Sequence, residues 1–228
     1  MSDAEFVDEA GELLSRIERL HGNERIAAAC RGSANPAALR WLVEALELGP
    51  GRIVADLGAG LGGPAEWIRS VAGCRVVAAD PSPTAVAGAR RLFGLDSVQS
   101  TAASAPFVDG TFDAVLLLGV LSVVDARAAV LREASRIGGS VGVLDYCSAS
   151  SETSCVGGSR FPTPTDVTAE LSSMWGQVRS VRIDEPTPPS WSRAADRAHA
   201  GIPTPRSERD VIEAIEAGRL VAHAFVGR

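Results

Sequence analysis

Apolar residues recur along this chain in short continuous runs separated by stretches with helical spacing, which predicts alternating strands and helices. The run at 112–119 contains four consecutive aliphatic residues, as expected of a strand buried on both faces. Strands joined by helical crossovers pair in parallel. The predicted fold is therefore α/β, with a Rossmann-like, mostly parallel seven-stranded sheet and helices on both faces. The predicted strands are 52–58, 75–80, 97–101, 112–119, 140–146, 178–183 and 221–227.

Two helices are predicted ahead of the first strand. Residues 4–20 carry an apolar stripe at helical spacing with acidic residues between, and Asn35 and Pro36 have the character of an N-cap and a first helical residue. The remaining helices are predicted to begin at Gly63 and Asp125 and to cover 83–93, 165–175 and 207–217.

The length of 228 residues favours one domain. We divide it into a helical cap (1–48), a cofactor-binding core (49–146) and substrate-side loops and closing strands (147–228). After Tyr146 the composition changes, and the connections become rich in Ser, Gly and Pro. Segments of this kind commonly build a substrate pocket.

The charge and composition narrow the classes of partner. A net charge of -6 without a dense Lys/Arg run argues against nucleic acid. The acidic N-terminus and the lack of a long apolar run predict a cytoplasmic protein without a membrane span. The four cysteines have no CxxC spacing, so we expect no bound metal.

The segment from Val54 to Pro64 runs from the first strand through four glycines, at positions 58, 60, 62 and 63, into a helix, where main-chain amides can hold a ligand. Its glycines fit a dinucleotide-binding pattern and do not by themselves separate a nicotinamide cofactor from S-adenosylmethionine. Asp56, directly before the glycines, disfavours a pyrophosphate and suits a cationic amino-acid group. We therefore set the nicotinamide oxidoreductase aside.

The sequence VADLGAGLGGPA resembles motif I of the class I S-adenosylmethionine-dependent methyltransferases. The segments at 75–86, 105–121 and 132–146 resemble their later motifs, in family order. The small-molecule branch, with sarcosine/dimethylglycine and ubiquinone-type methyltransferases, is the most similar. The resemblance also implies that the N-terminal helices form a lid over the cofactor.

The resemblance implies a role for each matching residue. Gly58, Ala59 and Gly60 would wrap the methionine portion, and Asp56 would face its ammonium group or the water bound beside it. Asp80, followed by Pro81, would accept the ribose hydroxyls. The residues implied at the adenine and at the methionine side are, in turn, Thr101 and Ala102, and Leu118 and Gly119.

The chain departs from the family pattern at two places. Thr101 replaces the acid that accepts the adenine amino group in many relatives, and LSVV at 121–124 replaces LEHV, which removes the usual general base. Candidates for a catalytic role are Asp145 and Tyr146, at the end of the fifth strand, and His199, in a Pro-flanked segment.

The sequence thus predicts an enzyme that methylates a small molecule, in a biosynthetic pathway of specialised metabolism. The alternative is a protein of the same fold that binds S-adenosyl-L-methionine without transferring its methyl group, as a partner subunit or as a catalyst of a different step. The sequence leaves open whether the chain forms a homodimer or binds a protein partner.

Overall fold

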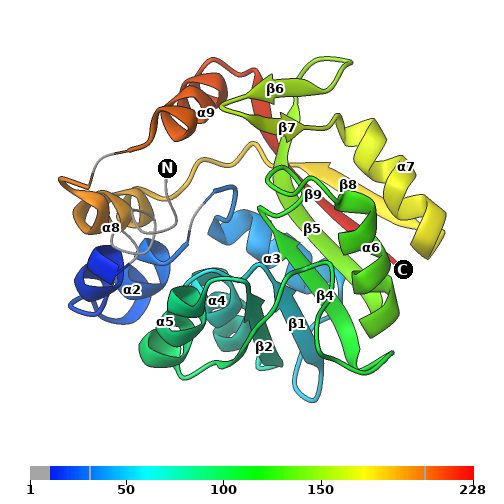
Figure 1. The fold of residues 1–228 in the computed structure, drawn as a ribbon, viewed down its shortest axis with the longest axis horizontal. Helices are drawn as coiled ribbons and strands as arrows, with labels where there is room; N and C mark the ends of the chain where they lie inside the picture. Colours follow the sequence, from blue (N-terminus) through cyan, green and yellow to red (C-terminus); the bar gives the residue numbers. More distant parts are fainter. Residues whose placement is uncertain (1–10, 31, 203) are drawn as a thin grey trace.

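The computed structural model describes residues 11–30, 32–202 and 204–228. A seven-stranded sheet runs through it in the order β3-β2-β1-β4-β5-β9-β8 (Figure 1). Strands β1 to β5 pair in parallel, and β9 pairs antiparallel with its two neighbours, β5 and β8. This arrangement confirms the predicted mostly parallel sheet. The strands are β1 (Ile53–Leu57), β2 (Arg75–Asp80), β3 (Asp96–Gln99), β4 (Phe112–Leu118), β5 (Gly138–Ser148), β8 (Val178–Arg182) and β9 (Leu220–Gly227).

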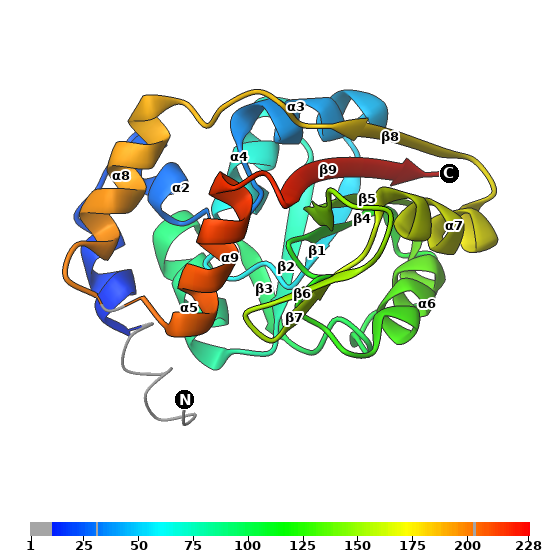
Figure 2. The same ribbon diagram turned by 90° about the horizontal axis from the view of Figure 1, so that it is seen from above.

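Helices cover both faces of this sheet (Figure 2). One core layer packs α3 (Pro36–Ala45) and α4 (Gly63–Ala72) against the sheet, with Val54 and Leu116 at its centre. The other packs α6 (Arg127–Ile137) and α7 (Pro164–Trp175) against the opposite face, around Val115. Consecutive residues of β4 point to opposite layers, so the buried part of the strand must be apolar, as residues 114–118 are; Asp113, near the start of the strand, is exposed.

Local signals fix where several helices begin. Asn35 caps α3 by accepting the amide of Ala38, and Ser82 caps α5 (Pro83–Phe93) by accepting the amide of Ala85. Proline occupies the first turn of both helices, where its missing N–H costs nothing. These two helices lie where the sequence predicts them.

The chain after β5 forms two elements above the carboxyl ends of the parallel strands (Figure 1). A short hairpin pairs β6 (Ser154–Val156) with β7 (Ser159–Phe161), and α9 (Arg206–Glu216) packs against β6 and β9. The hairpin turn at Gly157 lies directly against the backbone of Ser207 in the first turn of α9. The hairpin and α9 thus form one continuous cover, which we call the roof.

The structure corrects the predicted elements at three places. The first helix, predicted over 4–20, is helical at 11–17, and residues 4–10 lie outside the described ranges. A separate helix, α2 (Gly22–Ala28), follows it, and the Pro-rich segment read as a connection contains α8 (Pro189–His199). Helix α8 packs on α2 and buries Trp191 and Ala194. Within the described ranges, no helix is long and apolar enough to cross a bilayer.

Candidate functional site

The glycine-rich segment forms a tight turn between β1 and α4, at the carboxyl edge of the sheet. Gly58 and Gly60 both have positive φ, +79° and +54°, a backbone region that side chains other than glycine rarely adopt. Apart from its two neighbours in the chain, no described residue has an atom within 4 Å of the place that a Cβ of Gly60 would occupy. The turn therefore borders open space, as a loop that cradles a ligand should.

The end of α2 lies against this turn from above. A Cβ at Gly63 would lie 2.5 Å from the carbonyl carbon of Ala29, so only glycine permits this approach. The N-terminal part of the chain thereby contacts the glycine turn directly, which is where a lid would have to close.

Asp56 is a buried carboxylate near the end of β1. Its side chain is 1% exposed, and neither carboxylate oxygen has a hydrogen-bond partner among the described residues. Burial raises its pKa from 3.8 to about 7, and the negative charge of Asp80 adds to the rise. An unpartnered buried carboxylate is costly unless a cation or donor binds it. The resemblance assigns this position to the ammonium group of the methionine portion, and the structure fits that assignment.

Asp80 ends β2 and holds the glycine turn in place. Its Oδ2 accepts the amide of Gly60 at 2.8 Å, and its Oδ1 accepts the amide of Ser82 at 2.9 Å. Each carboxylate oxygen can accept a further hydrogen bond. The carboxylate is half-buried and remains able to accept the two hydroxyls of a ribose.

The other predicted cofactor residues lie along the same edge. Pro81 follows Asp80 directly, Thr101 and Ala102 follow β3, and Gly119 follows β4. Thr101 is exposed and Ala102 is buried. Because β1 to β4 are parallel neighbours, their carboxyl ends form one row, and all ten predicted cofactor residues belong to it.

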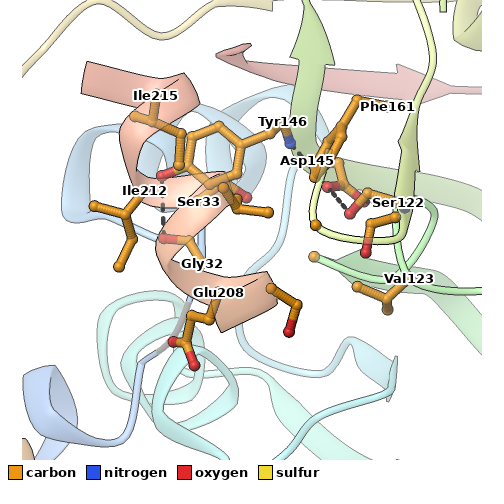
Figure 3. Close-up of a pocket in the computed structure, with 15 residues that line it drawn as sticks. Gly32, Ser33, Ser122, Val123, Asp145, Tyr146, Phe161, Glu208, Ile212 and Ile215 are labelled. Atoms are coloured by element: carbon orange, nitrogen blue, oxygen red, sulfur yellow. Dashed lines mark hydrogen bonds between the residues drawn. The ribbon is translucent and has the colours of Figure 1, made fainter. Parts of the chain in front are cut away.

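A cavity of about 470 Å³ opens beside this row, between β5, the loop after β4 and the roof (Figure 3). Gly119 lines it, and so do Asp145 and Tyr146. Its size falls in the range of small-molecule sites. The residues lining it are Gly32, Ser33, Gly119, Ser122, Val123, Asp145, Tyr146, Gly157, Ser159, Phe161, Ser207, Glu208, Val211, Ile212 and Ile215.

The side chain of Asp145 is buried and accepts three hydrogen bonds. It accepts the hydroxyl of Ser122 at 2.7 Å, the amide of Ser122 at 3.0 Å and the amide of Tyr146 at 2.8 Å (Figure 3). Burial raises its pKa, while these hydrogen bonds lower it; the net direction is upward. These contacts fix the loop after β4 to the end of β5, beside Gly119, so Asp145 positions the wall between the two halves of the site.

The other catalytic candidates lie in different places. The ring of Tyr146 packs in an apolar cluster with Phe161 and Val211, and its hydroxyl lies 3.4 Å from the carbonyl oxygen of Gly32. Burial raises the pKa of Tyr146, with a further contribution from the charge of Asp145, so it is a neutral phenol at pH 7. His199 ends α8, lies 2.9 Å through Nδ1 from the carbonyl oxygen of Ala195, and is not among the residues that line the cavity.

Sequence reasoning missed two parts of this cavity. Helix α9 contributes Val211, Ile212 and Ile215, and the segment between α2 and α3 contributes Gly32 and Ser33. The amphipathic pattern of 207–217 predicts that α9 buries one face, but not what that face covers. Within the described residues, no three His, Cys, Asp or Glu side chains are grouped as a metal site would require.

The comparisons with known proteins agree with this geometry. The profile of a family described as a methyltransferase domain matches residues 55–144. No protein with a curated description matches the chain significantly.

Three solved structures share the fold. The SpnF cyclase is 18% identical with a TM-score of 0.68, over 87% of this chain and 85% of the other. Geranyl diphosphate C-methyltransferase from Streptomyces coelicolor A3(2), solved with Mg²⁺, geranyl diphosphate and S-adenosyl-L-homocysteine, is 19% identical with a TM-score of 0.65, over 84% and 78%. A putative sarcosine dimethylglycine methyltransferase from Galdieria sulphuraria is 15% identical with a TM-score of 0.61, over 82% of each chain.

At these identities, the structural likeness establishes the fold, while the family match identifies the central segment. The matched residues begin within β1 and end within β5, so they include the glycine turn, Asp80 and Gly119. The match identifies residues 55–144 as a methyltransferase domain. The chain has the fold of the S-adenosylmethionine-dependent methyltransferases that its motif I resembles.

Proposed function

We propose that this protein transfers a methyl group from S-adenosyl-L-methionine to a small molecule held in the cavity under the roof. One observation carries the proposal: Gly119 belongs both to the row of predicted cofactor residues and to the cavity lining. A methyl donor along the row and an acceptor in the cavity would therefore meet at the end of β4.

The residues of the row fit the cofactor group by group. Asp56 offers an unpartnered buried carboxylate to an ammonium group, Asp80 offers acceptors to the ribose hydroxyls, and the glycine turn borders open space. When bound, S-adenosylmethionine supplies a methyl carbon whose bond to the cationic sulfur breaks as an acceptor's electron pair attacks it.

The chain's contribution to the reaction is then mainly positional, because in-line displacement depends on holding the two reactants close and aligned. Asp145 fixes the loop after β4 through Ser122, and that loop forms the shared wall. Tyr146 packs on the acceptor side of it. We assign Asp145 and Tyr146 to acceptor positioning, in preference to His199.

The cap also has a place in the proposal. The end of α2 lies on the glycine turn at Gly63, so movement of α2 would admit or retain the cofactor, while α3, also in the cap, stays packed in the core. We assign the core (49–146) to the cofactor and residues 147–228, with Gly32 and Ser33, to the acceptor.

Two measurements test the function. Calorimetric titration with S-adenosylmethionine and S-adenosylhomocysteine should give saturable binding at one site. Incubation with candidate acceptors, followed by mass spectrometry, should then give S-adenosylhomocysteine together with an acceptor one methyl group heavier. Absence of cofactor binding contradicts the proposal. Binding without transfer to any acceptor that occupies the cavity favours the alternative, a cofactor-binding protein that catalyses another step.

A further inference from the structure

Ser122 joins the acceptor cavity to the buried carboxylate of Asp145. Both residues line the cavity, and the Ser122 hydroxyl donates a hydrogen bond to Oδ1 of Asp145 at 2.7 Å (Figure 3). We propose that the oxygen of this hydroxyl accepts a hydrogen bond from the acceptor, which therefore carries an O–H or N–H group. The inference rests on the proposed function for the name acceptor, whereas the hydrogen-bonding site is a property of the cavity.

Main-chain hydrogen bonds determine the direction of the bond between these two side chains. Oδ1 of Asp145 also accepts the amide of Tyr146 at 2.8 Å, and Oδ2 accepts the amide of Ser122 at 3.0 Å. A main-chain amide can only donate, so each carboxylate oxygen is held as an acceptor. These contacts oppose the effect of burial and favour the ionised carboxylate. The serine is therefore the donor of the pair.

The Ser122 hydroxyl consequently has only its lone pairs to offer to a ligand. A hydroxyl has one proton, and this proton is directed to Asp145. Within the described residues, the bond to Asp145 is the only one that this hydroxyl forms. A hydroxyl that donates to a carboxylate is polarised, which strengthens its oxygen as an acceptor. The site thus suits an alcohol, a phenol or an amine better than an ether or a ketone.

The position of Ser122 places this site on the cofactor side of the cavity. Ser122 belongs to the loop that begins at Gly119, the residue shared by the cofactor row and the cavity lining. The amide of Gly119 donates to the carbonyl oxygen of Leu144 at 2.7 Å, which holds the start of the loop on β5. A ligand bound to Ser122 would therefore have its polar group at the wall next to the methyl donor.

Two ligands of nearly identical shape test the proposal. 2-Naphthol has an O–H group, and 2-fluoronaphthalene has the same ring system without a donor. Equilibrium dialysis against the full-length protein, with S-adenosylhomocysteine at saturation, measures both affinities. We expect 2-naphthol to bind about fivefold more tightly, the difference typical of one net hydrogen bond.

Variants of Ser122 locate this hydrogen bond. Ser122→Ala removes the hydroxyl, and Ser122→Cys keeps a donor to Asp145 but replaces the oxygen by sulfur, a weak acceptor. Both should lower the preference for 2-naphthol about threefold or more, and both should leave the affinity for 2-fluoronaphthalene within about twofold. Circular dichroism checks folding, and Ser122→Cys decides alone if Ser122→Ala does not fold.

A hydroxyl of the roof provides the matched control. Ser159, in β7, and Ser207, in the first turn of α9, also line the cavity and could bind the naphthol in place of Ser122. Ser159→Ala and Ser207→Ala should each leave the preference for 2-naphthol within about twofold of the wild-type value. Loss of the preference in either of them, with Ser122→Ala unchanged, would move the site to the roof and contradict the proposal.

Three further results overturn the proposal: no binding of 2-naphthol, equal or tighter binding of 2-fluoronaphthalene, or a preference that persists in the folded Ser122 variants. Calorimetry with S-adenosylmethionine separates these results from failure of the proposed function. If the cofactor binds and the preference is absent, the role of Ser122 is wrong and the proposed function stands. If the preference depends on Ser122 and the cofactor does not bind, the reverse holds.

Discussion

The main-chain amide of Gly60 donates a 2.8 Å hydrogen bond to Oδ2 of Asp80. The residue assigned to the ribose therefore also holds the glycine turn that is assigned to the methionine portion. The two ends of the predicted cofactor site are coupled through one carboxylate, and a change at Asp80 should affect both.

We expect Asp80→Ala to weaken S-adenosylmethionine binding by about 1.5 to 3 kcal/mol, the loss typical of hydrogen bonds to a charged group. Calorimetric titration measures the change. Asp96→Ala is the control, because Asp96 forms an exposed ion pair with Arg75 at the opposite end of β3 and contributes little there. Unchanged affinity in Asp80→Ala would remove this carboxylate from the site.

The raised pKa of Asp56 predicts that cofactor affinity depends on pH. The ionised carboxylate binds the ammonium group, and the pKa of about 7 means that protonation competes with binding below neutrality. From the ionised fractions, affinity should fall about eightfold between pH 7.5 and pH 6.0. Asp56→Asn, which cannot titrate, should bind weakly and almost equally at both pH values. A wild-type affinity that is the same at both pH values would contradict this role.

The same pKa predicts a cost in stability for the protein without cofactor. The folded-state pKa of Asp56 lies above its unfolded value of 3.8. The contribution of this carboxyl group to stability is therefore fully present below pH 3.8 and is lost as the pH rises to about 7. The ionised carboxylate should cost roughly 2 to 4 kcal/mol at pH 8. Urea unfolding between pH 5 and pH 8 measures this, with Asp56→Asn as the comparison. The variant should lack most of the decline, and an equal decline in both proteins would assign it to other groups.

Gly60→Val should abolish cofactor binding in a folded protein, because the added side chain enters the space that the ligand needs. Gly94→Val is the matched control: Gly94 also has positive φ, +63°, and no neighbour within 4 Å of its Cβ position, but it ends α5. Both variants carry a similar backbone penalty. Calorimetry should detect binding only in the second. Binding by Gly60→Val would show that the turn does not cradle the ligand.

Gly157 and Gly158 test whether the roof shapes the acceptor cavity. Both have positive φ, but a Cβ at Gly157 would overlap the carbonyl oxygen of Ser207, whereas a Cβ at Gly158 would have no neighbour within 4 Å. Gly157→Ala should push the hairpin away from α9. It should weaken binding of an apolar fluorescent probe, N-phenyl-1-naphthylamine, about fivefold or more, with cofactor affinity within about twofold. Gly158→Ala should change neither. Probe affinities that are equal in the two variants would mean that contact between the hairpin and α9 does not shape the cavity.

The sequence by itself determined the mostly parallel sheet and the alternation of strands and helices along the chain. It also determined which residues are predicted to bind the cofactor. These features depend on short-range signals: caps at Asn35 and Ser82, the apolar run 114–118 in β4, and glycines between β1 and α4. Because parallel strands place their carboxyl ends side by side, the sequence alone assigns motif residues that are distant along the chain to one edge of the sheet.

Only the tertiary structure decided the acceptor side. The prolines before and at the start of α8 favour a connection rather than a helix. Pro189, however, occupies the first turn of α8, where proline is tolerated, and the packing of Trp191 and Ala194 holds the helix in place. The hairpin has two three-residue strands, too short for a periodic signal. The cavity joins Gly32, Asp145, Phe161 and Ile212 from four separate segments. No local spacing encodes that meeting, because it results from long-range packing of the roof on the edge of the sheet.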